Sequence, residues 1–271
     1  MITVLGASGF VGSNLVKKLH DSNISFQAPK RGESLEGREL GHVIYCIGMT
    51  ADFRTKPFET VDAHVTVLSK ILQVCDFESL TYLSSTRVYI KTRSKNSSLT
   101  EADDIVINAL DATDLFASSK LTGELLAMNS GRKNIKIVRL SNVFGPDLLS
   151  ENFITSVVKD ALLNKKVELL TTATSAKDYI AVEDVCQALI KLASLESNGI
   201  FNLSYGRNTT NDAILREIEK ITGAEVSYSP LAKEIIFQEI SSEKISAAVG
   251  FKPTVDIIAA LPGIIAAFRS S

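Results

Sequence analysis

The chain has 271 residues, a formal net charge of −2 and 45% hydrophobic residues. This composition suits one large domain, or one domain with an appended lobe. The balanced charge gives no reason to expect nucleic acid or an anionic membrane as a partner. No apolar run reaches the roughly 18 residues that a membrane span needs. The sequence begins directly with a predicted strand, so we expect no signal peptide.

The cysteines and histidines are scattered along the chain. Cys46, Cys75 and Cys186 lie far apart in apolar segments, which is typical of reduced core thiols in a cytoplasmic protein. The histidines lack metal-ligand spacing, so we predict structural or surface roles for them and no metal site. They are His20, His42 and His64.

The first predicted elements are a strand over residues 1–5, a glycine-rich turn and an amphipathic helix. The turn reads Gly6-Ala7-Ser8-Gly9-Phe10-Val11-Gly12. This order places backbone N–H groups and the positive end of a helix where a pyrophosphate can bind. We therefore predict a dinucleotide site. Its expected residues are Gly6, Ser8, Gly9, Phe10, Val11 and Gly12.

Strands and helices then alternate through the first half. We expect strands at 24–28, 42–47, 80–84 and 135–140, and helices near 61–75 and 114–128. The link between the second and third strands is too short for the usual helix. The alternation favours an α/β fold with a doubly wound, Rossmann-like parallel sheet. The polar, basic segment 91–98 is predicted to be a solvated loop near the mouth of the site.

The regular alternation of strands and helices ends after Gly145-Pro146. We expect helices at 153–163, 182–192, 212–221 and 257–268, with strands at 167–170 and 199–203. The sheet domain should therefore comprise residues 1–147 and 176–204. A smaller, interleaved C-terminal substrate lobe should comprise 148–175 and 205–271, with the ligand cleft between them at the carboxyl ends of the strands.

The charges after the second strand predict the cofactor. An acidic residue there accepts the ribose hydroxyls of NAD, but this stretch reads Gln27-Ala28-Pro29-Lys30-Arg31, with no acid before Glu33. Lys30 and Arg31 suit a 2′-phosphate, which arginine can bind through two hydrogen bonds. We predict NADP(H) in preference to NAD(H). A solvated basic loop is the alternative interpretation.

Several segments, in order along the whole chain, resemble the extended short-chain dehydrogenases/reductases of the nucleotide-sugar epimerase/dehydratase/4-ketoreductase family. The opening VLGASGFVG resembles the cofactor turn, LTYLSSTRVY the strand before the catalytic Ser or Thr, and LFASSKLTGE the helix of the YxxxK pair. IVRLSNVFGPD, KDYIAVEDVCQALI and the C-terminal GIFNLSYGRNTTNDAILREIEKITG resemble later family segments.

The resemblance implies catalytic positions. It places the hydrogen-bonding serine at Ser85 and the catalytic lysine at Lys120, which in the family also holds the cofactor ribose. The catalytic tyrosine position is Phe116, which has no proton to give. The chain is then an engineered Tyr→Phe variant, an enzyme whose acid is Tyr89, Tyr179 or a water, or a binding protein that lost the chemistry. Asp62, where the family often has Asn, leaves the proton relay there open.

The resemblance also implies a substrate, a nucleotide-diphosphate sugar. Family dehydratases carry an Asp-Glu pair after the catalytic residue, but here Thr86 and Arg87 follow Ser85 and cannot do that acid–base work. We therefore favour an NADPH-dependent reductase of a 4-keto-sugar nucleotide. A 4-epimerase is the first alternative, and a catalytically dead NADP-binding regulatory or scaffold protein is the second.

Four residues are expected to contact the substrate: Thr86, Arg87, Asn142 and Arg207. Asp178 and Tyr179 resemble a segment that braces the lobe. Homodimers are common in the family through the two helices near 61–75 and 114–128, so we expect a homodimer here.

Overall fold

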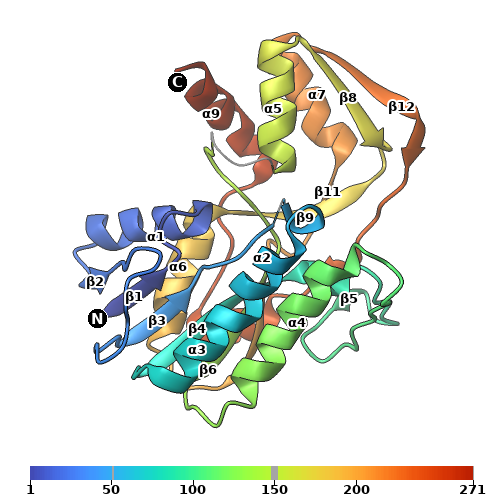
Figure 1. Ribbon diagram of the computed structural model, residues 1–271. Coiled ribbons are helices and arrows are strands. Elements are labelled where there is room, and N and C mark those ends of the chain that lie inside the picture. The colour runs from blue at the N-terminus through green and yellow to red at the C-terminus, as the bar shows by residue number, and fades with distance from the viewer. Residues whose placement is uncertain (51, 148–151, 271) are drawn as a thin grey trace.

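A parallel sheet lies at the centre of the larger part of the molecule (Figure 1). The structure, a computed structural model, describes residues 1–50, 52–147 and 152–270, and within these ranges six strands form this sheet in the order β10-β6-β4-β3-β1-β2. All neighbouring strands are parallel, which confirms the predicted sheet. The strands are β1 (Ile2–Leu5), β2 (Phe26–Gln27), β3 (His42–Tyr45), β4 (Ser79–Ser85), β6 (Ile135–Leu140) and β10 (Gly199–Leu203).

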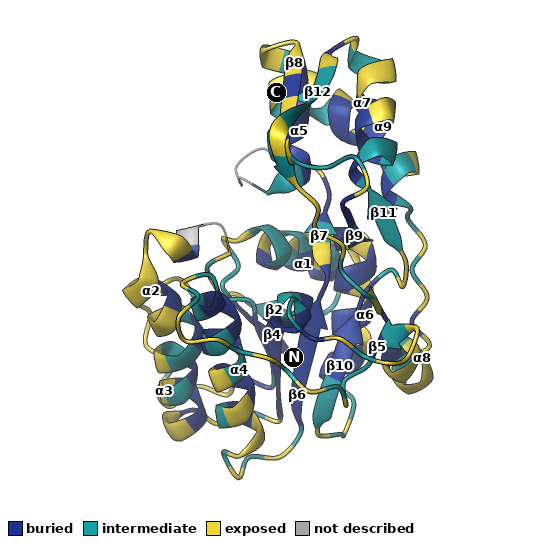
Figure 2. Ribbon diagram, turned by 90° about the vertical axis from the view of Figure 1, so that its right-hand side faces the viewer, coloured by how far each residue is buried: buried dark blue, intermediate teal, exposed yellow. Residues whose placement is uncertain are grey.

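Helices cover both faces of this sheet, as the doubly wound fold requires. On one face α1 (Phe10–Asp21) contacts α6 (Val182–Ala193). On the other face α3 (Val67–Val74) contacts α4 (Asp114–Met128). One apolar core fills the space beneath each pair, and the central strands between them are almost wholly buried (Figure 2).

The helix expected near 61–75 is built differently from its prediction. It consists of α2 (Pro57–Val61), a π turn (Asp62–Thr66) and α3, so its turn widens in the middle. A regular helix would bury Val61 with Val65 and Leu68, but the π turn breaks that spacing. The helical spacing of the apolar residues from Val61 to Cys75 predicts that they share one buried face, but Val61 is 38% exposed while Leu68 is fully buried, so that prediction is wrong for Val61.

The smaller lobe has its own apolar core. Its elements are α5 (Phe153–Leu163), β8 (Lys166–Thr171), α7 (Asn211–Thr222), β12 (Glu225–Lys233) and α9 (Ile257–Arg269). The three helices lie together at the upper end in Figure 1, and β8 pairs in parallel with β12. Gly223 ends α7 with a positive φ of 67°, the left-handed cap that glycine adopts without steric cost.

A second sheet joins the two parts. Within the described ranges it contains β7 (Asn142–Phe144), β9 (Ala176–Ala181) and β11 (Asn208–Thr210). Successive side chains of a strand point to opposite faces. Ile180 of β9 therefore enters the core of the sheet domain, while Tyr179 and Ala181 enter the core of the lobe.

Residues 239–251 return to the sheet domain, although the sequence placed them in the lobe. There β13 (Glu239–Ile240) pairs with β5 (Ser98–Leu99), and α8 (Glu243–Val249) contacts β10. Ile245 and Phe251 are buried in the same core as α6, which explains why this segment leaves the lobe. Segment 91–98 was expected to be a solvated loop. Its last residue, Ser98, instead begins β5, and Thr92 within it is buried.

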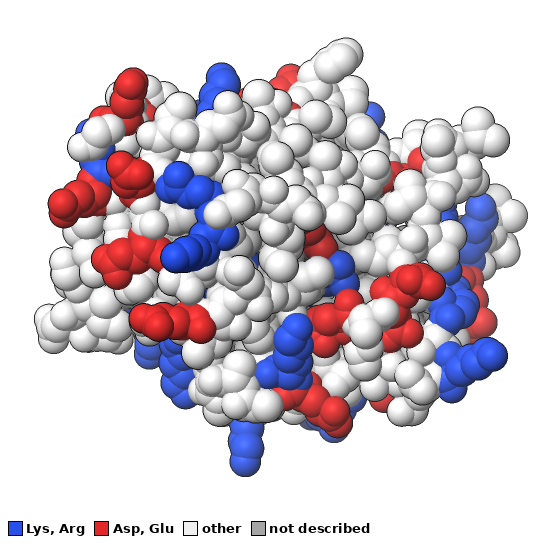
Figure 3. All heavy atoms as spheres, turned by 90° about the horizontal axis from the view of Figure 1, so that it is seen from below, with Lys and Arg blue, Asp and Glu red and all other residues white. Residues whose placement is uncertain are grey.

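Charged side chains of both signs are interspersed on the face seen in Figure 3. They form no large field of one sign there, in keeping with the net charge of −2. Within the described ranges, no helix combines the length and the apolar character that crossing a bilayer demands.

Candidate active site

The glycine-rich turn joins β1 to α1 at the carboxyl edge of the sheet. Gly6 has a φ of +84°, and its carbonyl accepts a hydrogen bond from the Gly9 N–H at 3.1 Å. A Cβ on Gly12 would lie 2.2 Å from the Gly6 oxygen, so only glycine allows the helix to come this close. A tight turn and a close approach of helix to strand are what a dinucleotide-binding turn requires of its glycines.

The first turn of α1 is open to an anion. Gly9 caps the helix without a side-chain hydrogen bond, and the first turn holds no acidic residue. The N–H groups there are therefore available to a phosphate. Ser8 is exposed on the turn, whereas Phe10 and Val11 direct their side chains into the sheet-domain core and offer only backbone groups.

A groove of about 1380 Å³ opens beside this turn. It is lined by residues 5–9 after β1, by 28–36 after β2 and by 46–49 after β3, together with residues of the helices at 56–75. It therefore lies at the carboxyl ends of β1 and β3, where the connections leave in opposite directions, which is where open α/β sheets bind ligands.

The basic residues after β2 lie in this groove. Lys30 and Arg31 line it, and no helix forms in residues 28–41, as the short link predicted. Glu33 also lines it, but its carboxylate accepts hydrogen bonds from the Lys30 N–H (2.8 Å) and the Arg38 guanidinium (2.6 Å). These contacts lower the pKa of Glu33 and leave it poorly placed to receive ribose hydroxyls.

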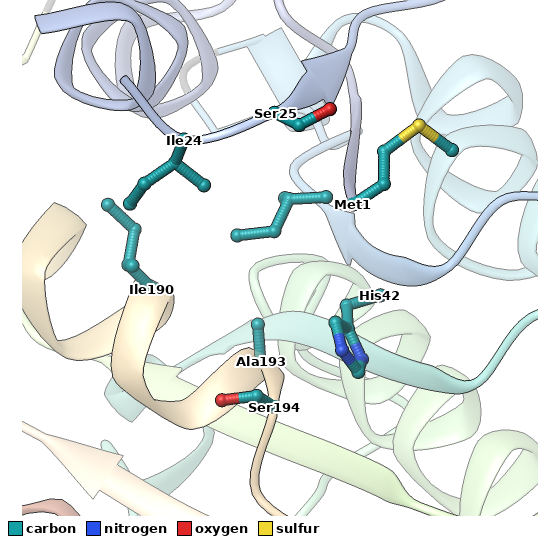
Figure 4. Close-up of a pocket in the computed structure, with 8 residues that line it drawn as sticks. Met1, Ile24, Ser25, His42, Ile190, Ala193 and Ser194 are labelled. Carbon is teal, nitrogen blue, oxygen red and sulfur yellow. The ribbon is translucent and has the colours of Figure 1, made fainter. Parts of the chain in front are cut away.

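A smaller cavity lies at the opposite edge of the sheet (Figure 4). It has a volume of about 260 Å³ and is lined mainly by apolar side chains, among them Met1, Ile24 and Ile190. It adjoins the amino ends of β1 and β3 and the last turn of α6. This is the wrong edge of the sheet for the ligand of such a fold.

Ser85 and Lys120 both lie at the carboxyl end of β4. The Ser85 Oγ accepts a hydrogen bond from the Arg87 N–H at 3.1 Å and so caps the 3₁₀ turn Thr86–Tyr89. In the described part of the chain the Ser85 hydroxyl donates to no other group, so its proton is available to a ligand. The Lys120 ammonium donates to the Leu83 carbonyl at 2.8 Å. Lys120 is only 4% exposed, and this burial lowers the pKa of its ammonium to about 7.

This end of the sheet also fits a dinucleotide. Within the part of the chain that the structure describes, the Lys120 ammonium donates to one carbonyl and keeps further N–H groups for a ligand. A Cβ on Gly48 would lie 3.2 Å from the Lys120 Nζ, so the glycine after β3 keeps the approach to the lysine open.

Phe116 lies one helical turn before Lys120 and is 3% exposed. Its ring centroid is 5.4 Å from that of Phe53 and 5.4 Å from that of His64, which meets it edge-on. The aromatic ring at the family's tyrosine position is therefore enclosed by other rings.

His64 is a buried structural residue, in keeping with the role expected of the histidines, but its position beside Phe116 was not predicted. Its Nε2 accepts from the Met49 N–H (3.2 Å), so Nδ1 carries the proton and donates to the Ser119 Oγ (2.8 Å), which donates to the Phe116 carbonyl (3.0 Å). Burial, followed by the nearby Lys120 charge, lowers the pKa of His64 to about 2. His64 belongs to the π turn, and helical spacing alone does not reveal such a turn.

Neither tyrosine offered as an alternative acid is available at this site. The Tyr89 hydroxyl donates to Thr100 and Asn202 oxygens and lies against the Arg139 guanidinium. The Tyr179 hydroxyl is buried in the core of the lobe, where it has no hydrogen-bond partner within the described ranges.

The expected substrate residues are spread over two regions. Thr86 is buried and Arg87 half-buried on the turn that follows Ser85. Asn142 lies at the joint, where its Nδ2 donates to the Asp178 carbonyl at 2.8 Å. Arg207 lies apart, on the lobe side, in an ion pair with Asp256 at the start of α9.

Asp178 braces the joint between the two parts. The Asp178 carboxylate accepts the N–H groups of Tyr205 and Gly206 (2.9 and 2.7 Å), which ties β9 to the turn before β11. Asp62 is exposed in the π turn and lines the groove.

In the described ranges, no cluster of His, Cys, Asp or Glu side chains has the arrangement of a metal site.

The six-stranded parallel sheet, the switch-point groove and the glycine turn are those of an extended short-chain dehydrogenase/reductase. Residues 2–204 match the sequence profile of the "NAD dependent epimerase/dehydratase family", and the chain belongs to this family. A stretch of 163 residues is 23% identical to a dTDP-D-glucose 4,6-dehydratase from Dictyostelium discoideum. That match covers 56% of this chain but only 38% of the relative, so it spans well under half of the relative's length.

Solved structures with the same fold cover nearly the whole chain. MoeE5 in complex with UDP-glucose and NAD has a TM-score of 0.82 at 21% identity, over 99% of this chain and 98% of that one. RMD from Pseudomonas aeruginosa complexed with NADPH has a TM-score of 0.81 at 21% identity, over 100% of both chains. A UDP-glucose 4-epimerase from Thermotoga maritima has a TM-score of 0.79 at 20% identity, over 99% of this chain and 98% of that one.

Proposed function

We propose that this protein is an NADP(H)-dependent reductase of a 4-keto-sugar nucleotide. The observation that carries the proposal is the position of Ser85 and Lys120 at the carboxyl end of β4. Ser85 ends the strand, while the Lys120 ammonium donates to the Leu83 carbonyl and lies beside Gly48, which lines the groove. Thr86 and Arg87 stand where the family's dehydratases carry an acidic pair, which favours reduction over elimination.

The preference for NADP(H) is supported by charge. Lys30 and Arg31 line the groove, and the nearby Glu33 carboxylate is engaged by Arg38. A 2′-phosphate would gain two cations there and meet no free carboxylate from Glu33. Replacing Lys30 and Arg31 together by Ala should weaken NADPH binding much more than NADH binding. Equal losses for both cofactors would contradict this preference.

The chain's own groups can support a reduction without a phenol. The bound nicotinamide supplies the hydride. Ser85 has a free hydroxyl proton to donate to the keto oxygen, and Lys120 has an ammonium whose pKa of about 7 suits proton transfer near neutrality. Phe116 excludes water from this corner together with Phe53.

The enclosed Phe116 ring favours a second candidate, a protein that binds NADP(H) without chemistry. An enzyme should be stabilised by a UDP-, dTDP- or GDP-sugar in the presence of NADPH, whereas a cofactor sensor should respond to NADPH alone.

The deciding experiment is therefore a thermal-shift panel of nucleotide sugars with NADPH, followed by product analysis with the 4-keto form of any ligand that binds. NADP⁺ formed in proportion to product would support the reductase. Product without net cofactor change would identify a 4-epimerase. Stabilisation by NADPH with neither sugar binding nor reaction would reject both enzyme proposals.

We also propose that the protein works in the cytoplasm. Cys46, Cys75 and Cys186 are free thiols in the structure, and burial raises the pKa of Cys46 and Cys186 to about 12. Unreactive, unpaired thiols of this kind suit a reducing compartment.

A further inference from the structure

A buried ion pair joins α4 to the strands β4 and β6, against which this helix packs (Figure 1). The Glu124 carboxylate of α4 accepts two hydrogen bonds from the Arg139 guanidinium of β6, from Nε at 3.1 Å and from Nη2 at 2.6 Å. It also accepts the hydroxyl of Ser84, which is paired with Arg139 across β4 and β6. One carboxylate therefore ties the carboxyl ends of both strands to the helix.

This ion pair lies beside the two residues of the proposed reaction. Ser84 directly precedes Ser85, and Glu124 follows Lys120 by four residues, one turn further along the same face of α4. The Lys120 ammonium donates to the carbonyl of Leu83, the residue before Ser84. The Glu124 carboxylate therefore fastens the same short piece of β4 to which the Lys120 ammonium is hydrogen-bonded.

The other edge of the guanidinium holds the turn that follows Ser85. The Arg139 Nη1 donates to the Tyr89 hydroxyl at 2.5 Å, and the guanidinium carbon is 4.9 Å from the centroid of the Tyr89 ring. Tyr89 ends the 3₁₀ turn that the Ser85 Oγ caps, and its hydroxyl lies 3.0 Å from the Asn202 Oδ1 of β10. The chain is therefore held on both sides of Ser85, at Ser84 and at Tyr89.

The Glu124 charge also acts on the Lys120 ammonium. Burial lowers the pKa of Lys120 to about 7, and Glu124 has the largest effect in the opposite direction. In the described part of the chain, burial keeps the other ionisable groups around Lys120 neutral near pH 7, because it raises the pKa of a thiol and a phenol and lowers the pKa of an imidazole. These groups are Cys46 after β3, Tyr82 of β4 and His64 of the π turn.

We propose that Glu124, held by Arg139, is a positioning residue that fixes the Ser85 end of β4 against α4 and keeps the Lys120 ammonium charged and in place. Because Glu124 is buried within this network, it acts through Lys120 and not by touching a ligand. The assignment rests on the proposed function, since it concerns the reacting residues of the same site. A purely structural ion pair would support folding but would leave the titration of Lys120 unchanged.

The first test follows the titration of Lys120 in the protein without any ligand. NMR of protein made with isotope-labelled lysine records it, and the Lys120 signal is the one lost in Lys120→Met. Glu124→Gln keeps the shape of the side chain and removes its charge. Loss of a nearby opposite charge shifts a pKa by about one unit or more. The Lys120 midpoint should therefore fall from about 7 to about 6 or lower.

Two further variants separate charge from folding. Glu124→Asp keeps the charge and should restore most of the midpoint. Lys136→Met is the matched control: Lys136 is fully buried on β6, and its ammonium donates to the Ala193 and Leu195 carbonyls at 2.9 and 2.8 Å. It should lose stability in denaturant unfolding, as Glu124→Gln does, but should leave the Lys120 midpoint unchanged.

A double variant covers the case in which Glu124→Gln does not fold. Glu124→Leu combined with Arg139→Met leaves neither charge buried alone. It should still lower the Lys120 midpoint, because Glu124 supports the ammonium and Arg139 has no comparable effect on it.

The second test measures the consequence for the reaction. Single-turnover NADPH oxidation is recorded with a 4-keto-sugar nucleotide that the thermal-shift panel identifies. Glu124→Gln should react about tenfold more slowly than the parent at pH 8, because about tenfold less Lys120 is protonated there. The loss should be smaller at pH 5.5, where both proteins carry the ammonium.

The outcomes separate this assignment from the proposed function. An unchanged Lys120 midpoint in the Glu124 variants overturns the assignment, whether or not a substrate is found. An equal shift in Lys136→Met also overturns it, because lost packing and not the Glu124 charge would then move the midpoint. A midpoint that shifts only in the Glu124 variants supports the assignment. If such a protein reacts with no 4-keto-sugar nucleotide, the control of Lys120 by Glu124 stands and the proposed function is rejected.

Discussion

At the scale of single residues, the protonation of Lys120 should make the reaction rate depend on pH. Its pKa is lowered to about 7, so the ammonium loses its proton as the pH rises through that value. If it donates the proton, single-turnover NADPH oxidation should fall by about tenfold per pH unit above ~7. NADPH binding, measured at each pH, serves as the control. A rate that stays flat between pH 7 and 9 would exclude Lys120 as the proton donor.

His64 should make folding stability depend on pH. The folded protein keeps this imidazole neutral, with a pKa of about 2, whereas the unfolded chain binds a proton near 6.5. Below pH ~6.5 the unfolded state therefore binds more protons, and stability falls by up to about 1.4 kcal/mol per pH unit.

Denaturant unfolding between pH 4 and 7 measures this slope. His64→Gln should reduce it, and His20→Gln should leave it unchanged because the His20 side chain is 80% exposed. The same slope in all three proteins would mean that other groups govern acid unfolding.

At the scale of elements, a buried ion pair ties α4 to the sheet. Glu124 accepts hydrogen bonds from the Arg139 Nε at 3.1 Å, from its Nη2 at 2.6 Å and from the Ser84 hydroxyl. Both charged side chains are almost fully buried. Glu124→Ala would leave the buried Arg139 guanidinium without a counter-charge and should cost about 3–5 kcal/mol in the free energy of unfolding.

Two comparisons make that measurement specific. Glu217→Ala, which breaks an exposed pair with Lys220 on α7, should cost less than about 1 kcal/mol. Replacing Glu124 by Leu and Arg139 by Met together should cost less than Glu124→Ala alone, because no charge is then left unpaired. A double variant as unstable as the single one would show that packing, not charge, dominates.

Long, strongly periodic elements were predictable, and short or irregular ones were not. The helices α4 and α5 and the strands β6 and β10 have the predicted bounds, because each buries a continuous apolar pattern. The strands β7, β9 and β11 were missed, since their pairing depends on chain segments far apart in sequence. The positions of Phe53 and His64 beside Phe116 were also missed, because a 3₁₀ turn and a π turn place them there.

At the scale of the whole molecule, exposed apolar side chains on the helix pair α3 and α4 are consistent with the expected homodimer. Val74 of α3 (60%) and Leu125 of α4 (58%) are exposed on the helix pair that covers one face of the sheet. We propose that a second copy covers these side chains. Leu125→Glu should then convert a dimer into a monomer in light scattering, whereas Leu163→Glu, on the lobe, should not. A wild-type protein that is monomeric at tens of micromolar would contradict this proposal.

The helix-free connection between β2 and β3 has a consequence for redesign. Residues 28–41 carry Lys30 and Arg31 at the groove, and both ends are fastened to the sheet: the Gln27 amide donates to the Thr3 hydroxyl and the Glu39 carbonyl, and Leu40 is fully buried. No packed helix would have to be refitted if this segment were exchanged. The two residues proposed to select NADP(H) therefore lie in one exchangeable segment. Grafting a different segment between β2 and β3 would test that proposal without altering the carboxyl end of β4.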